Sequence, residues 1–231
     1  MHETLTPHDW VAHLSKRLST LRPDIPEGVR LIAVTKTFPA AAVAAAYSLG
    51  LRDFGESKVQ ETEQKQQQLS DLKDITWHLI GHLQTNKARK AVQLYDWIHS
   101  VDSLKIAKKL NQAAADLDRR PYCCLQVKIL PDPDKYGFEP DALLTALPEL
   151  GQLSSLKIVG LMAILPFGLT AAQSQTAFEQ VRILANRVNQ MSVSSLQIDY
   201  LSMGMSGDFR SAIAAGATFI RLGTILFGQR Q

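Results

Sequence analysis

The chain has 231 residues, 45% hydrophobic and 20% charged, which is an ordinary composition for a soluble globular protein. Its formal net charge is +3, and apart from one cluster at residues 87–90 the basic residues are spread out, which argues against a nucleic-acid-binding surface. The first ten residues hold no apolar signal-peptide core, and Pro and Gly interrupt every long apolar run before it could span a membrane. We therefore expect neither nucleic acid nor membrane as a partner.

The cysteine and histidine content points to a reducing compartment and to no metal site. The two cysteines, Cys123 and Cys124, are neighbours in an apolar run and are poorly placed to bridge each other, so a cytoplasmic location is predicted. His78 and His82 are four positions apart, but no carboxylate or cysteine spacing completes a set of metal ligands around them. Both are interpreted as core or loop histidines.

Short apolar runs alternate with helical patterns along the chain. Residues 9–21 carry apolar side chains at three-to-four spacing and predict an N-terminal amphipathic helix. The predicted strands lie at residues 31–36, 52–54, 76–80, 97–101, 122–129, 158–164, 197–201 and 218–222. The predicted helices between them lie at residues 40–49, 58–71, 86–94, 103–117, 141–150 and 172–191, and the Gln-rich one at 58–71 is interpreted as a solvated face.

Eight strands that alternate with helices favour a single (β/α)8 TIM barrel over residues 1–231, with the helix at 9–21 as an N-terminal addition. No linker or low-complexity stretch divides the chain, so one α/β domain is predicted. The competing fold is a doubly wound open sheet, which usually has fewer strands. No glycine-rich dinucleotide loop follows the first strand, so the barrel is preferred.

The first predicted strand ends in a lysine. Four apolar residues are followed by Thr35 and Lys36, as in a strand buried on both faces. A lysine held beside desolvated surroundings can lose its proton near neutral pH and act as a Schiff-base nucleophile. The alternative is a surface lysine whose aliphatic stem covers a strand end.

Glycines and hydroxyls follow the last two predicted strands, where barrels often bind phosphate. After the seventh strand, Ser206 can cap the next helix and Gly207 permits close approach of a ligand to the backbone. After the eighth strand stand Gly223 and Thr224. Either stretch alone is more often a helix cap, but the two together predict a phosphate cup.

Arg221 ends the apolar eighth strand, so its guanidinium should be desolvated. Its partner is then either a carboxylate or an acceptor on a ligand. A lysine, a phosphate cup and an arginine at one barrel mouth suit a phosphorylated aldehyde that carries a ring acceptor. Pyridoxal 5'-phosphate (PLP) fits this description.

The chain also resembles the pyridoxal phosphate homeostasis protein family, nearly from end to end. The resemblance implies the fold of the alanine racemase N-terminal barrel, which agrees with the strand count. It is carried by AVTK at residues 33–36, FGE at 54–56, VQE at 59–61, WHLIGHLQTNK at 77–87, LSMGMSGD at 201–208 and RLGTILFG at 221–228.

The resemblance implies a role for individual residues. It assigns the covalent aldimine with PLP to Lys36 and the position facing the pyridine nitrogen to Arg221. Ser57 stands where the family usually has Asn, and its shorter hydroxyl would reach the cofactor only through water. The remaining implied contacts are Met203 near the ring, and Ser206, Gly207, Gly223 and Thr224 at the phosphate.

An arginine at the pyridine nitrogen argues against catalysis. An arginine keeps its proton at neutral pH, so it cannot supply the proton that makes the ring a strong electron sink, and transamination and decarboxylation are disfavoured. Racemization needs a second acid/base, which similar racemases take from a tyrosine of an added domain. This chain ends seven residues past Thr224, so we expect no such domain, and nothing places Tyr136 over the cofactor.

The sequence thus predicts a monomeric, non-catalytic protein that holds PLP for intracellular vitamin B6 homeostasis, with PLP-dependent apoenzymes as transient recipients. The alternatives are a PLP-dependent amino-acid racemase, and a phosphosugar aldolase that traps a sugar carbonyl on Lys36. The aldolase requires the family resemblance to be accidental.

Overall fold

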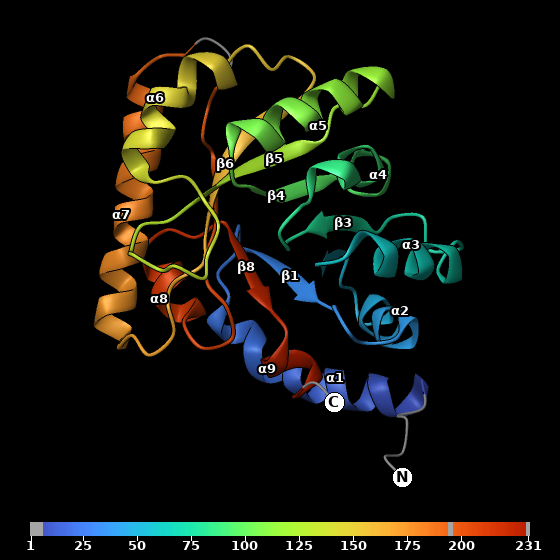
Figure 1. The fold of residues 1–231 in the computed structure, drawn as a ribbon. Helices are drawn as coiled ribbons and strands as arrows, with labels where there is room; N and C mark the ends of the chain where they lie inside the picture. The colour runs from blue at the N-terminus through green and yellow to red at the C-terminus, as the bar shows by residue number, and fades with distance from the viewer. Residues whose placement is uncertain (1–6, 194–195, 230–231) are drawn as a thin grey trace.

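Eight parallel strands close into a barrel in the computed structural model, which describes residues 7–193 and 196–229 (Figure 1). Each strand pairs with the next, and the eighth pairs with the first, so the predicted barrel is confirmed. The strands are β1 (Arg30–Val34), β2 (Asp53–Glu56), β3 (Thr76–Leu79), β4 (Trp97–Val101), β5 (Tyr122–Val127), β6 (Lys157–Ala163), β7 (Tyr200–Ser202) and β8 (Phe219–Leu222).

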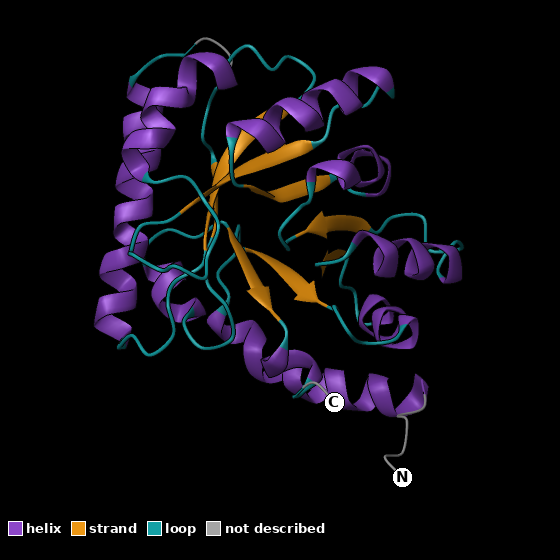
Figure 2. Ribbon diagram, in the orientation of Figure 1, coloured by secondary structure: helices purple, strands orange, loops and turns teal. Residues whose placement is uncertain are grey.

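Helices surround the barrel on its outside (Figure 2). Thr170 begins the longest of them with a capping box, in which its hydroxyl accepts from the Gln173 backbone and the Gln173 side chain bonds back. Within the described ranges, no helix is long and apolar enough to cross a membrane. The helices are α1 (Pro7–Leu21), α2 (Ala40–Ser48), α3 (Val59–Gln68), α4 (Ala88–Leu94), α5 (Leu104–Asp116), α6 (Pro140–Leu150), α7 (Ala171–Gln190), α8 (Phe209–Ala214) and α9 (Thr224–Phe227), with 3-10 turns at Arg22–Asp24 and Thr85–Lys87.

The N-terminal helix α1 is confirmed, and it packs against α2 and α9. Its apolar residues Leu14 and Leu18 are buried, and Trp10 meets the ring of Phe227 edge-on. Arg17 Nη1 donates hydrogen bonds to two backbone carbonyls of α9. The first helix of the chain therefore supports the short helix that follows the last strand.

The barrel interior is filled by side chains rather than open. At its amino end an apolar cluster contains Ile32, Trp97, Cys124, Met162 and Phe219. The helix-facing sides of the strands contribute to a much larger core. Buried polar side chains, including His78 and His99, pack against this cluster and are described below.

Several strands are shorter than predicted, and in β5 and β7 other groups satisfy the backbone that was expected to pair. The Asn189 side chain bonds both the N–H and the carbonyl of Ile198, so the segment before Tyr200 has no need of strand pairing. After Val127, the following loop returns, and Phe138 bonds the end of β5 through its own backbone. This second contact ends β5 two residues before the predicted boundary.

Candidate functional site

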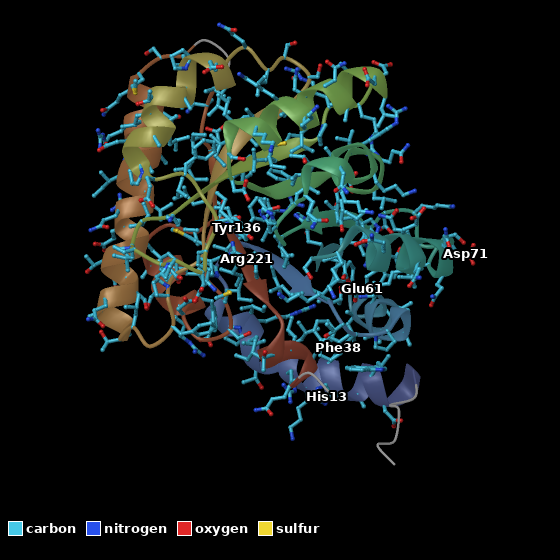
Figure 3. All side chains as sticks on the ribbon, viewed as in Figure 1. His13, Phe38, Glu61, Asp71, Tyr136 and Arg221 are labelled. Atoms are coloured by element: carbon cyan, nitrogen blue, oxygen red, sulfur yellow. The ribbon has the colours of Figure 1, made fainter. Side chains whose placement is uncertain are left out.

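A cavity of about 470 Å³ opens at the carboxyl ends of the strands. This volume suits a cofactor-sized ligand. Lys36 lines it from just past β1, and Arg221 lines it from β8. Figure 3 shows Arg221 within the ring of strands. The other predicted residues that line it are Ser206, Gly207, Gly223 and Thr224.

Two other sequence candidates lie outside this lining. Met203 is fully buried in the main hydrophobic core. Ser57 is packed so closely against Gly81 that a Cβ on that glycine would lie 2.6 Å from the Ser57 Cβ. A role for either residue in ligand contact stays a prediction.

The turn after β7 has a fixed backbone. Gly204 has a φ of +93°, and a Cβ there would lie 2.6 Å from the Cβ of Ala212, so glycine is required. The Asp208 carboxylate accepts the Met205 N–H at 2.6 Å, and burial raises the pKa of this carboxyl. In contrast, a Cβ on Gly207 would meet nothing within 4 Å, which leaves bare backbone beside the cavity.

A hydroxyl connects the two halves of the predicted phosphate cup. Ser206 Oγ accepts a hydrogen bond from the Ile225 N–H at 3.3 Å, which joins the turn after β7 to α9. Gly223 precedes α9 and packs beside Val34 of β1, where an added Cβ would be in ordinary contact. The two hydroxyl-bearing segments thus form one wall of the cavity.

Arg221 is 3% exposed, and its hydrogen-bond partners are neutral groups, although the charge of Asp208 also acts on it and favours its charged form. Its Nη1 donates to the carbonyl and the hydroxyl of Ser202 at 2.6 and 2.7 Å, and its Nη2 donates to the Ala163 carbonyl at 2.8 Å. No described carboxylate forms an ion pair with it. Burial lowers the pKa of Arg221 to about 10, so the guanidinium stays charged at neutral pH.

The sequence left two possible partners for Arg221, a carboxylate or an acceptor on a ligand. These contacts show that no described carboxylate bonds it. A guanidinium carries five N–H donors. Three are used by the protein, and no described residue accepts from the Nε–H or from the second Nη2 hydrogen. The residue can therefore still donate to an acceptor on a ligand.

The backbone beside Lys36 is held in an uncommon conformation. Thr37 has a φ of +70°, in the left-handed region that residues with a Cβ seldom adopt. Its N–H donates to Glu61 Oε1 at 2.6 Å, and Glu61 accepts from Lys65 Nζ at 2.8 Å. This arrangement fixes the direction in which the chain leaves Lys36.

A buried ion pair lies directly under this segment. Lys65 Nζ donates to Glu56 Oε1 at 2.6 Å and to the Thr35 carbonyl at 2.7 Å. Thr35 in turn donates its hydroxyl to the same Glu56 oxygen. Burial raises the pKa of Glu56 even though the Lys65 charge opposes that shift. Thr35, the residue before Lys36, therefore belongs to a buried polar cluster with Glu56 and Lys65.

Comparisons with known proteins place this chain in a family. The family model described as alanine racemase, N-terminal domain, matches residues 11–231. A pyridoxal phosphate homeostasis protein of Synechocystis sp. is 52% identical over 206 residues, covering 89% of this chain and 94% of the relative. This chain belongs to the pyridoxal phosphate homeostasis protein family.

Solved structures of PipY have the same fold. PipY from Synechococcus elongatus, solved without PLP, has a TM-score of 0.90 and 53% identity, covering 93% of this chain and 100% of PipY. PipY with PLP bound has a TM-score of 0.89 and 52% identity, with the same coverage. The family resemblance drawn from the short motifs is therefore confirmed, and so is the barrel fold that it implied.

Sequence reasoning missed several polar residues of this family member. The Gln-rich helix was interpreted as solvated, but Lys65 points inward from it and its side chain is only 6% exposed. The spacing of Glu61 and Lys65 could have predicted their contact, because residues four apart on a helix lie on one face. The second partner of Lys65, Glu56, is on a different element.

The two histidines of the third strand region have separate partners. His78 is fully buried and is a core histidine, as interpreted. His82 bonds Asp102 at 2.7 Å and stacks on Tyr136 with ring centroids 3.7 Å apart. Tyr136 therefore packs on His82 and is not among the residues that line the cavity. No cluster of potential metal ligands occurs in the described part of the chain.

Proposed function

We propose that this protein binds PLP in the cavity, holds it as a Schiff base on Lys36, and serves PLP homeostasis with little or no turnover of its own. The observation that carries the proposal is that one cavity is lined by Lys36, Arg221 and the two glycine- and hydroxyl-bearing segments. A relative at 52% identity has been solved with PLP bound, which supports the same ligand for this chain.

Each lining group has a definite task in this proposal. The Lys36 amine would hold PLP by condensing with its aldehyde, with loss of water. Ser206, Gly207, Gly223 and Thr224 would hold the phosphate through hydroxyls and backbone N–H groups. When bound, PLP supplies an electron-withdrawing ring, whose strength as a sink depends on the state of its nitrogen. Arg221 can only donate, so it suits a ring nitrogen that carries no proton.

The lining supports holding rather than racemization. The titratable side chains among the described lining residues are Lys36, Asp208 and Arg221. Asp208 already accepts a backbone N–H, and Tyr136 packs on His82 outside the cavity. Neither Asp208 nor Tyr136 is therefore placed to act as the second acid/base that racemization needs on the opposite face of a substrate.

The proposal extends to the setting in which the protein works. We place it in the cytoplasm as a monomer that passes PLP to apoenzymes. The buried free thiols Cys123 and Cys124 support a reducing compartment. Size-exclusion chromatography with light scattering tests the monomer, and reactivation of a PLP-dependent apoenzyme by the loaded protein tests the transfer.

Trapping with borohydride tests the central claim. The purified protein mixed with PLP should turn yellow, and reduction followed by peptide mass mapping should place the label on Lys36. Lys36→Ala should lose the colour and the label, whereas Lys58→Met, at an exposed lysine nearby, should retain both. A protein that takes up no PLP, or that is labelled elsewhere, refutes the proposal. Interconversion of single amino-acid enantiomers that Lys36→Ala abolishes would replace it with the racemase.

A further inference from the structure

A chain of five polar side chains runs from the cavity down through the barrel interior. Arg221 Nη1 lies 2.7 Å from Ser202 Oγ, and that hydroxyl lies 2.8 Å from His99 Nδ1. His99 Nε2 lies 2.9 Å from His78 Nδ1, and His78 Nε2 lies 2.8 Å from Asp53 Oδ1. The five residues come from β8, β7, β4, β3 and β2, so the chain crosses the barrel rather than following one strand.

The two ends of the chain, taken together with neutral histidine rings, leave one direction for every hydrogen bond in it. A guanidinium can only donate, so Ser202 Oγ accepts from Arg221 and its own hydrogen is available to His99 Nδ1. A carboxylate can only accept, so His78 Nε2 carries a hydrogen directed at Asp53. In the middle contact His99 Nε2–H then donates to His78 Nδ1. Both histidines are neutral in this arrangement, each with its hydrogen on Nε2.

The electrostatic environment agrees with these protonation states. Burial lowers the pKa of His78, and it lowers that of His99 well below the usual histidine value. Burial opposes ionization of Asp53, but its hydrogen bonds and proximity to His78 and Arg30 hold the pKa of this carboxyl below the usual value. The chain therefore ends in a carboxylate that pairs with Arg30 at the amino end of β1.

We propose that Ser202, His99, His78 and Asp53 are positioning residues that fix the Arg221 guanidinium and keep two of its donors for the PLP ring. This inference rests on the proposed function. The acceptor atom of each group in the chain points toward Arg221. The buried charge of the Arg221 guanidinium is thereby stabilised without a carboxylate in contact with it. A carboxylate beside Arg221 would compete for the donors that the cavity needs. The chain ends at the Asp53 carboxylate, which pairs with Arg30 and whose side chain is 17% exposed. The charge of Asp208 also favours the charged form of Arg221, without forming an ion pair or hydrogen bond with it.

The pattern of hydrogens on the histidines can be measured without PLP. Long-range ¹H–¹⁵N spectra of the PLP-free protein should show His78 and His99 neutral, with hydrogen on Nε2 and none on Nδ1. Ser202→Ala should move the Nδ1 resonance of His99, because that nitrogen loses its donor. Ser100→Ala is the matched control, since Ser100 is equally buried beside His99 and its hydroxyl has no partner in the described structure. Three results would contradict the proposed series of hydrogen bonds: a charged histidine ring, a hydrogen on Nδ1 of either histidine, or a His99 Nδ1 resonance that is unchanged in Ser202→Ala.

The positioning role is measured with PLP. Ser202→Ala should weaken PLP binding about tenfold and shift the absorption maximum of the bound cofactor, because a hydrogen bond to a charged group is lost. Ser100→Ala should behave as the wild type. His99→Gln provides a second interruption of the same chain, and thermal unfolding verifies that each variant is folded. Unchanged affinity and spectrum in both chain variants, beside a wild type that binds PLP, overturn the positioning role. A wild type that binds no PLP refutes the proposed function instead, and the histidine spectra then report on the chain alone.

Discussion

Replacing Lys65 by methionine should test whether the buried polar cluster under Lys36 stabilises the fold. The Lys65 side chain is 6% exposed and that of Glu56 is fully buried. Removal of one partner from a buried ion pair typically costs about 3–5 kcal/mol, because the other charge is left without compensation. The second partner, Glu61, is 22% exposed and can regain water, so we expect the lower end of that range, about 3 kcal/mol. For a chain of this length this corresponds to a fall in Tm of roughly 6–12 °C.

The effect should depend on pH in a definite direction. Burial raises the pKa of Glu56 already in the wild type, and loss of the Lys65 charge raises it further. A group whose folded-state pKa is raised favours the fold at low pH and loses that contribution as pH rises through the folded-state pKa. The gap in Tm between Lys65→Met and the wild type should therefore be small at acid pH, where Glu56 is protonated, and largest at pH 7–8.

Calorimetry at several pH values measures the effect, and a surface ion pair provides the control. Lys90 pairs with Glu63, and both side chains are more than a third exposed. Lys90→Met should cost at most about 1 kcal/mol and show no comparable pH dependence. The reasoning is refuted if the two variants melt together at pH 7, or if the gap for Lys65→Met widens as the pH falls.

Three further changes follow from the geometry. Gly204→Ala should destabilise the fold by about 1–3 kcal/mol in urea unfolding, because of its positive φ and the 2.6 Å approach to Ala212; an unchanged midpoint would contradict this strain. His82→Gln should leave PLP affinity unchanged by equilibrium titration, since His82 lies outside the cavity lining, and a large loss would show that the site extends there. Cys123 and Cys124 should resist a thiol reagent until the protein unfolds, because burial raises the pKa of both thiols; rapid labelling of the native protein would argue otherwise.

The parts of the fold that could be predicted are those encoded locally. Alternation of apolar runs and helical patterns gave the eight strands and the helix α1, and the hydroxyls and glycines at strand ends marked the cavity wall. The boundary of β7 could not be predicted, because the bonds that replace strand pairing come from the side chain of Asn189 on the preceding helix.

The interior polar chain could not be predicted for a different reason. His99 and Ser202 are 103 positions apart, and they meet only because β4 and β7 face each other across the closed barrel. The sequence of a strand can indicate which of its side chains point into the barrel. The register between strands then determines which of those side chains meet. For the same reason the sequence left the partner of Arg221 open between a carboxylate and a ligand, whereas the structure provides Ser202 and the Ala163 carbonyl.

The contact between α1 and α9 supports one wall of the cavity from outside the barrel. Arg17 holds the carbonyls of Thr224 and Ile225 at 3.2 and 3.0 Å, across 207 and 208 positions of sequence. Thr224 lines the cavity, and the Ile225 N–H bonds Ser206 on the other side of the same wall. Displacement of α1 would remove two hydrogen bonds from that wall without touching the cavity itself. A helix near the start of the chain therefore helps to hold in place the cavity wall that the end of the chain provides.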